Sequence, residues 1–156
     1  MYLVLSGINS KYIVLFSLII FLASCDRSTY EIHMNAFVAD ANNSILLKAM
    51  DGQNILTYQN HTHSDLEKFQ TGGVDLQAFA VWVDPEKFTD EEYFLRADNM
   101  IGKLEYLCSR IPNNWKIIKS YQDINNNIRR NIMSCMIGIE GGHVIGKDIN
   151  KIEYLY

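Results

Sequence analysis

Three apolar runs constrain the fold of this chain most, and they lie at residues 36–39, 75–83 and 132–139. Each run is short, rich in aliphatic or aromatic residues, and followed at once by an acidic residue. Runs of this kind are typical of strands that are buried in a parallel sheet. The segments between them carry helical signals, and apolar strands that alternate with helices indicate βα units. The sequence therefore predicts an α/β fold with about three parallel strands.

Four helices are expected between and after these runs. Ser44 is a candidate N-cap for the first helix, and residues 89–92 form a capping box that opens the longest one. An apolar stripe at helical spacing follows that capping box and would face the sheet. The predicted helices span residues 45–50, 89–110, 122–130 and 148–156.

Polar and acidic residues at the ends of the strands are the first candidate site. The carboxyl ends of parallel strands meet at one edge of the sheet, and in barrels of βα units the chemistry takes place at that edge. Two glycines after the last strand favour a tight loop there, because glycine readily adopts positive φ. The alternative to a functional site is a solvent-exposed turn with ordinary surface side chains. The residues expected to share this edge are Asp40, Asn42, Ser44, Asp84 and Glu140.

The N-terminus resembles a targeting signal. Lys11 precedes an apolar run at residues 13–23, which is too short to span a bilayer because a spanning helix needs about 20 residues. The run ends in Leu-Ala-Ser-Cys, which resembles the bacterial lipobox, where cleavage precedes a cysteine that carries lipid. The alternatives are a plain secretory signal and a short membrane anchor. We predict a signal peptide at residues 1–24, a lipid on Cys25, and a membrane-anchored lipoprotein of the cell envelope, in the periplasm or on the outer surface.

The net charge and the cysteine spacing argue against nucleic-acid binding and against a CxxC metal site. The net charge is −4 and no basic stripe with interleaved aromatic residues occurs, which argues against nucleic-acid binding. Cys108 and Cys135 do not form a CxxC metal motif. A disulfide between them in an oxidising envelope is one outcome, but two buried free thiols are the expected one.

Four segments resemble, in order and spacing, the membrane (renal-type) dipeptidases: residues 39–47, 63–66, 72–83 and 138–143. Members of this family are (β/α)8 barrels of the TIM type, with two zinc ions, that hydrolyse dipeptides. The resemblance therefore implies that this chain contains the N-terminal part of such a barrel, about three βα units, and stops where the family continues. Periodicity alone leaves a barrel and an open doubly wound sheet as alternatives. After a tether at residues 25–36, we expect one partial dipeptidase-like domain at residues 37–156.

The resemblance also implies where metal would bind. The family's first strand ends in a His-x-Asp pair of zinc ligands, and the matching positions here are Asn42 and Ser44, so both ligands are replaced. The family's bridging glutamate matches Glu140, which is retained. An amide oxygen is a poor zinc ligand, and a serine hydroxyl would have to lose a tightly held proton. We assign no catalytic residue, and we expect this chain alone not to hold zinc stably.

Two histidine features lie outside this ligand set. His61 and His63 have a spacing that suits metal binding on a strand, but they lie in a polar connection, so we do not expect a zinc site there. His143 is interpreted as a hydrogen-bond donor that orders the loop after Glu140. Glu67 stands where the family has proline, which bears on the shape of the loop.

Two functional interpretations remain. The first is a lipid-anchored zinc dipeptidase, in which metal-bound hydroxide attacks a dipeptide. The second is a non-catalytic remnant or a half-barrel subunit that needs a second chain. A partial barrel has open sheet edges, and we expect an inner face with nothing to pack against, so the chain alone would be aggregation-prone or molten. It would gain order by self-association or by pairing with a C-terminal half. The residues expected on that face are Phe37, Phe79, Val81, Met133 and Ile137.

Overall fold

The computed structural model describes residues 28–155. The predicted signal peptide and Cys25 lie outside these residues and stay predictions. The chain divides into two units, Met1–Asn35 and Ala36–Tyr156. The described part of the first unit holds one helix, α2 (Thr29–Asn35), which has no buried residue. The second unit carries the α/β fold and is described below.

Among residues 28–155, no helix combines the length and the apolar character that crossing a membrane requires.

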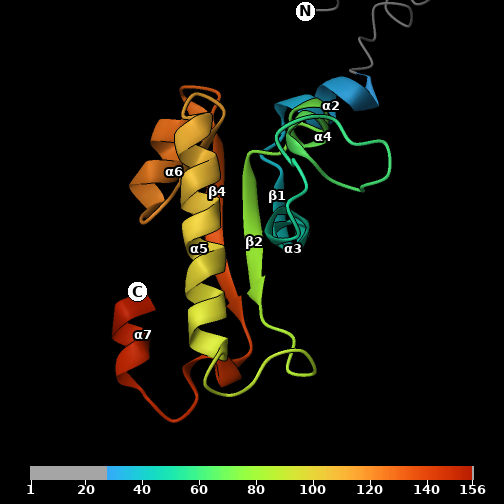
Figure 1. Ribbon diagram of the computed structural model, residues 1–156. Coiled ribbons are helices and arrows are strands. Elements are labelled where there is room, and N and C mark those ends of the chain that lie inside the picture. The colour runs from blue at the N-terminus through green and yellow to red at the C-terminus, as the bar shows by residue number, and fades with distance from the viewer. Residues whose placement is uncertain (1–27, 156) are drawn as a thin grey trace, which may run out of the picture. The chain divides into compact units, whose positions relative to one another are not determined.

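Four parallel strands form one sheet in the order β1-β2-β4-β3. Figure 1 labels β1, β2 and β4 of this sheet. The strands are β1 (Ala39–Asn43), β2 (Leu76–Trp82), β3 (Trp115–Ile117) and β4 (Met133–Glu140). The prediction of a parallel α/β sheet is confirmed, but the expected number of strands is too low. The sequence gives little sign of β3, because it has three residues and the middle one is Lys116. The first strand also begins at Ala39, where the predicted run ended.

The helices follow the predicted ranges closely. They are α3 (Ile45–Met50), α4 (Leu66–Thr71), α5 (Tyr93–Arg110), α6 (Tyr121–Ile128) and α7 (Asn150–Leu155), with a 3-10 turn η1 at Gly142–Ile145. Neither α4 nor η1 was expected, and α2 was not expected either, since it lies in the stretch predicted to be a tether, residues 25–36. One of the two bonds of the capping box forms, since Thr89 N donates to Glu92 Oε2 at 2.9 Å, but it closes a turn before α5 begins.

The hydrophobic core lies between the sheet and the helices α3, α4 and α5. Phe79 is fully buried, and its ring centroid is 5.4 Å from that of Trp115 and 6.2 Å from that of Phe69. Val81 and Met133 belong to the same cluster, and Ile137 packs against it. These side chains were expected to lie on an uncovered inner face, and that expectation is wrong.

The physical reason is strand alternation. In β2, Phe79 and Val81 point toward the helices, so Ala78 and Ala80 point to the opposite face. The same rule places Met136 opposite Cys135 on β4, and Met136 is 40% exposed. Phe37 precedes β1 and is 52% exposed, so it belongs to neither face. The face away from α5 therefore carries three small residues, Ala78, Ala80 and Gly138, with Trp82 and Met136 as its large side chains nearby.

The last strand is buried only in its first half, although its apolar run predicted a buried strand. Residues 133–135 are buried, whereas Met136, Ile139 and Glu140 are exposed. β3 pairs with residues 133–135 of β4 alone, so residues 136–140 have no strand partner on that side within the described part of the chain. The open edge of β4 thus coincides with its exposed half.

Candidate functional site

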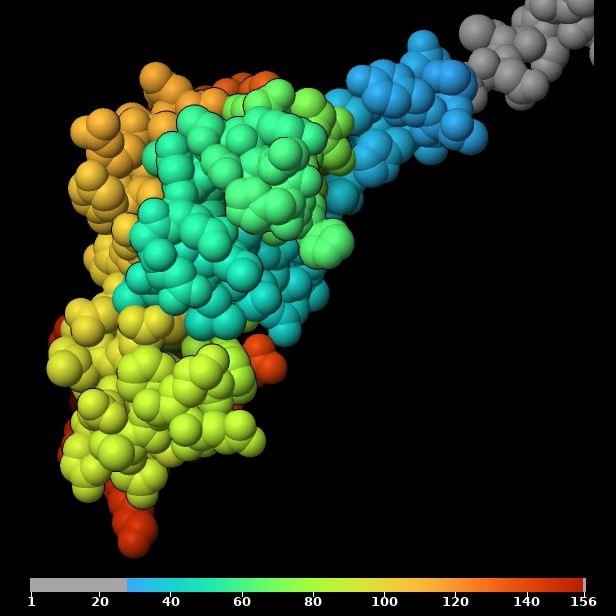
Figure 2. All heavy atoms as spheres, turned by 45° about the vertical axis from the view of Figure 1, so that its right-hand side comes forward, coloured from blue at the N-terminus to red at the C-terminus, as the bar shows by residue number. Residues whose placement is uncertain are grey.

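A cavity of about 200 Å³ lies at the carboxyl end of the sheet, on the face that carries the small side chains. Asn42 of β1 and Glu140 of β4 both line it, with Ala78 and Ala80 of β2 and Gly138 of β4 between them. In the space-filling view, the end of β4 emerges between the segment around α3 and the segment that follows β2 (Figure 2). The prediction that Asn42 and Glu140 share one edge of the sheet is confirmed.

An irregularity in β1 accompanies the position of Asn42. Asp40 pairs with Gln77 and Asn43 pairs with Phe79. Between these two pairs, β1 therefore contains one more residue than β2. An inserted residue of this kind bends a strand and redirects its side chains. Asn43 then turns toward the loop before α4, where its Oδ1 accepts hydrogen bonds from Ile45 N at 3.0 Å and Ser64 Oγ at 3.2 Å.

The other three residues expected at this edge do not line the cavity. Ser44 is exposed and is the N-cap residue of α3, but its side chain makes no capping bond, and the first N–H of the helix, that of Ile45, donates to Asn43. Asp40 Oδ1 accepts from Asn42 N at 3.2 Å, within its own strand. Asp84 organises the turn after β2, where it pairs with Lys87 Nζ at 3.2 Å.

Contacts within its own turn lower the pKa of Asp84. The backbone N–H of Glu86 donates to Asp84 Oδ1 at 3.0 Å. This hydrogen bond, with the nearby Lys87, holds the pKa of Asp84 below its usual value. Asp84 therefore stabilises a loop, and its charge is already satisfied away from the cavity.

The side chains around the cavity do not fit a zinc ion. Zinc in catalytic sites is held by about three protein ligands drawn from histidine, cysteine and carboxylates. Glu140 is the one such residue among those that line the cavity, and Asn42 offers only a neutral amide. Over residues 28–155, no three His, Cys, Asp or Glu side chains come close enough together to hold a metal ion.

His61 and His63 lie in the loop before α4 and are exposed. That loop is fastened by Asp65, which is fully buried and accepts hydrogen bonds from Gln59 N at 3.0 Å and Lys68 N at 2.9 Å. Burial raises the pKa of Asp65, but the hydrogen bonds and the Lys68 ammonium, 2.8 Å away, outweigh it and lower the pKa overall. The loop is thus ordered by Asp65, and its histidines do not line the cavity.

His143 orders the loop after Glu140, as predicted. Its Nε2 lies 2.9 Å from the Val83 carbonyl oxygen, and because a carbonyl can only accept, Nε2 donates. The ring also meets Tyr93 of α5 edge to face, with centroids 5.0 Å apart. Gly141 has φ of 95°, and a Cβ there would lie 2.5 Å from the His143 ring. Only glycine at this position lets the ring reach Val83.

Sequence reasoning missed the small residues that form the floor of the cavity. Ala78 and Ala80 alternate with Phe79 and Val81 in β2, and this alternation of small and large residues was a readable signal. It marks the large residues as the core face and the small ones as the cavity face. Gly138 sits opposite Ala80 in the neighbouring strand and extends the same floor.

Comparisons with known proteins identify the family and the fold. A family model described as membrane dipeptidase, peptidase family M19, matches residues 27–156. Among solved structures, dipeptidase AC, described as a metallopeptidase of family M19, has a TM-score of 0.68 and 22% identity over 76% of this chain and 39% of its own. The probable dipeptidase PvdM from Pseudomonas aeruginosa has a TM-score of 0.71 and 16% identity over 81% of this chain and 33% of its own.

An amidohydrolase from Pseudomonas aeruginosa has a TM-score of 0.60 and 16% identity over 83% of this chain and 33% of its own. At these identities the likeness concerns the fold. The chain spans 33–39% of the length of these three structures. Its parallel sheet accordingly represents the N-terminal part of a TIM-barrel-like fold.

Proposed function

The chain belongs to the membrane dipeptidase family, peptidase family M19, and from this premise we propose that it is a metal-deficient member which does not by itself hydrolyse dipeptides. The observation that carries the proposal is the cavity in which Glu140 faces Asn42 without a second anionic or imidazole ligand. Family membership makes dipeptides the expected ligands. Glu140 offers the negative charge with which the ammonium group of a short peptide pairs.

The donor set argues against hydrolysis on chemical grounds. One carboxylate neutralises half the charge of a divalent ion, and the remaining lining side chains are a neutral amide and apolar groups. Lowering the pKa of a bound water to about 7 requires an ion that is held firmly and keeps one open position. Glu140 alone cannot hold an ion firmly, so it acts as a negative charge at the carboxyl edge of the sheet.

We expect the full chain, incubated with zinc and then desalted, to retain well below one zinc per chain and to show no zinc-dependent dipeptide hydrolysis. The matched variant is Asn42→His with Ser44→Asp, which returns the two ligand types that the family carries at these positions. Aspartate is a good N-cap residue and position 42 is exposed, so this variant should fold. Its zinc retention should rise, since Asn42→His adds an imidazole to the cavity that Glu140 lines, whereas Ser44→Asp adds a carboxylate at a position outside that lining.

Metal analysis of the desalted protein and a dipeptide hydrolysis assay measure these outcomes. The proposal would be overturned if the unaltered chain retained one or two zinc ions. It would be overturned equally by zinc-dependent hydrolysis that Glu140→Gln abolishes.

A second proposal concerns what completes the sheet. β1 lies at one edge of the sheet, and residues 136–140 of β4 have no strand partner on their outer side in the described part of the chain. Unpaired N–H and C=O groups at such edges bind further strands. We propose that these edges are covered by the C-terminal half of a dipeptidase-type barrel or, when that half is absent, by self-association.

Sedimentation of the refolded chain should therefore show species larger than a monomer, whose share rises with protein concentration. Met136→Lys places a charge beside the open edge of β4, where the side chain is 40% exposed, and should shift the distribution toward monomer. Tyr121→Lys, on the exposed surface of α6 at 76% exposure, is the control and should leave the distribution unchanged. A monodisperse monomer at every concentration would show that the edges are already protected.

A further inference from the structure

Two thiols that the dipeptidase chemistry does not use lie side by side in the core. Cys108 is in the last turn of α5, and Cys135 is in the buried half of β4. Both thiols are free, as predicted, and both belong to the same core cluster, where each shifts the pKa of the other. Neighbouring thiols form a disulfide where their Cα atoms lie within about 7 Å of each other.

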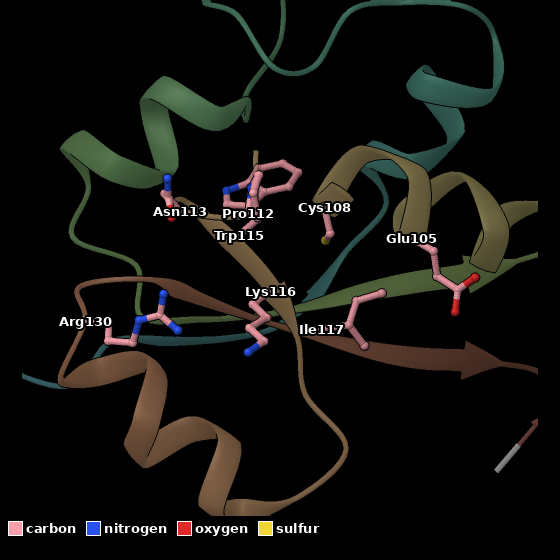
Figure 3. Close-up of a pocket in the computed structure, with 8 residues that line it drawn as sticks. All are labelled: Glu105, Cys108, Pro112, Asn113, Trp115, Lys116, Ile117 and Arg130. Carbon is pink, nitrogen blue, oxygen red and sulfur yellow. The ribbon is translucent and has the colours of Figure 1, made fainter. Parts of the chain in front are cut away.

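Only one of the two sulfurs can be reached from outside. A cavity of about 440 Å³ opens beside the edge strand β3, and Cys108 lines it while Cys135 does not (Figure 3). Cys108 is 8% exposed and Cys135 is fully buried. A small reagent that enters the cavity therefore meets Cys108 first, and Cys135 lies behind it.

The two thiols also differ in acidity. The hydrogen bond from Cys135 lowers the pKa of Cys108, and the backbone N–H of Ile117 adds to this, so together they outweigh burial and the charge of Glu105. Burial raises the pKa of Cys135, and an ionised Cys108 raises it further. Because the thiolate is the nucleophile in thiol chemistry, the reachable sulfur is also the reactive one.

We propose that Cys108 is a site of thiol–disulfide exchange and that Cys135 is its resolving partner, so that a small disulfide entering the cavity closes a Cys108–Cys135 link between α5 and β4. In the first step the Cys108 thiolate attacks one sulfur of the reagent, and the other sulfur leaves as a thiolate. In the second step the Cys135 sulfur attacks Cys108 in the mixed disulfide, releasing the second thiolate, which takes up the Cys135 proton. Two protein thiols are oxidised and one reagent disulfide is reduced to two thiols.

The charges at the cavity indicate an anionic reagent. Lys116 and Arg130 line the opening, with Glu105 as the one acidic side chain among the lining residues. The excess of positive charge raises the local concentration of anions. Glutathione disulfide, a peptide disulfide with net negative charge, is the probe that suits this surface.

Closing the link would join the end of α5 to β4, one of the two inner strands of the sheet. The bond would enclose residues 108–135, which contain β3 and α6. A cross-link around a loop of this length restricts the unfolded chain and raises stability. In the oxidised chain the midpoint of thermal unfolding should rise by several degrees.

The test uses the full chain with Cys25→Ala, so that the thiol count reports Cys108 and Cys135 only. The protein is incubated with glutathione disulfide, remaining thiols are blocked with iodoacetamide, and tryptic peptides are weighed. We expect peptides 104–110 and 131–147 to be joined by one disulfide, with loss of both free thiols and recovery after dithiothreitol. Cys135→Ser should stop at glutathione on Cys108, whereas Cys108→Ser should leave Cys135 unmodified in the folded chain.

Guanidinium chloride provides the control for geometry. In the folded chain, Cys108 of Cys135→Ser should react at least about tenfold faster than Cys135 of Cys108→Ser, and in denaturant the two rates should converge. The proposal fails if both thiols of the folded chain remain free after incubation. It also fails if glutathione reaches Cys135 in folded Cys108→Ser as fast as it reaches Cys108, since Cys135 would then not be the hidden partner.

Discussion

The Cys25→Ala variant should accumulate as an unprocessed precursor without lipid, and the mature membrane-bound form should disappear. The expectation follows from the Leu-Ala-Ser-Cys ending of the apolar run, because in a lipobox the cysteine sulfur is the group that accepts the lipid. Gel mobility reports processing, metabolic labelling with a radioactive fatty acid reports lipidation, and partition into detergent reports membrane attachment. All three should change together, since lipidation precedes cleavage.

Cys108→Ala is the matched control for this experiment. It removes a thiol from the same chain, but from a buried position in α5, so labelling and processing should stay as in the unaltered protein. A Cys25→Ala chain that matures to normal size and still partitions into detergent would show that a plain signal or an anchor, and not a lipid, holds the protein.

Phe79→Ala should lower the free energy of unfolding by about 3 to 5 kcal/mol. The Phe79 side chain is fully buried and sits between Phe69 and Trp115, so its removal leaves a cavity in the centre of the core. Domains have about 5 to 15 kcal/mol of stability in total, and the variant would lose a large part of it. Urea unfolding followed by tryptophan fluorescence measures the loss, because Trp115 is in direct contact with the altered site.

Met136→Ala is the control on the opposite face of the sheet. Met136 is 40% exposed, so truncating it should cost less than about 1 kcal/mol. The pair of variants tests which face of the sheet is the core. Equal losses from Phe79→Ala and Met136→Ala would mean that the two faces are buried alike, as in a sheet that is covered on both sides.

The predictable part of the fold rests on local signals. Three such signals are each contained in a short stretch of sequence and are present in the structure: the apolar run of β2, the Thr89–Glu92 bond of the capping box before α5, and the apolar stripe along α5. β3 was missed because a strand of three residues is too short to show an alternating pattern. Its place depends on pairing with Met133–Cys135 of β4, which lies further along the chain. The start of β1 was misplaced because its residues Ala39–Asn43 are mostly polar and exposed.

The candidate site divides in the same way. Glu140 and Asn42 were found from sequence, since each follows or ends a strand and parallel strands share their carboxyl edge. Ser44 and Asp84 were placed beside them by the same rule, but the chain turns into α3 at Ser44 and into a salt-bridged turn at Asp84. Local capping and turn contacts therefore decided which strand-end residues reach the cavity.

The sequence by itself determined the α/β class, the long helix and the two thiols. Only the tertiary structure decided that Phe79 and Val81 face the helices, that small residues form the cavity, and that Cys108 touches Cys135. The physical reason is that an apolar run predicts a strand, but when both alternating sets of side chains are apolar it does not show which set faces the core. The choice is made by helices packing from elsewhere in the chain, which cover the large side chains and leave the alanines and glycine to the other face.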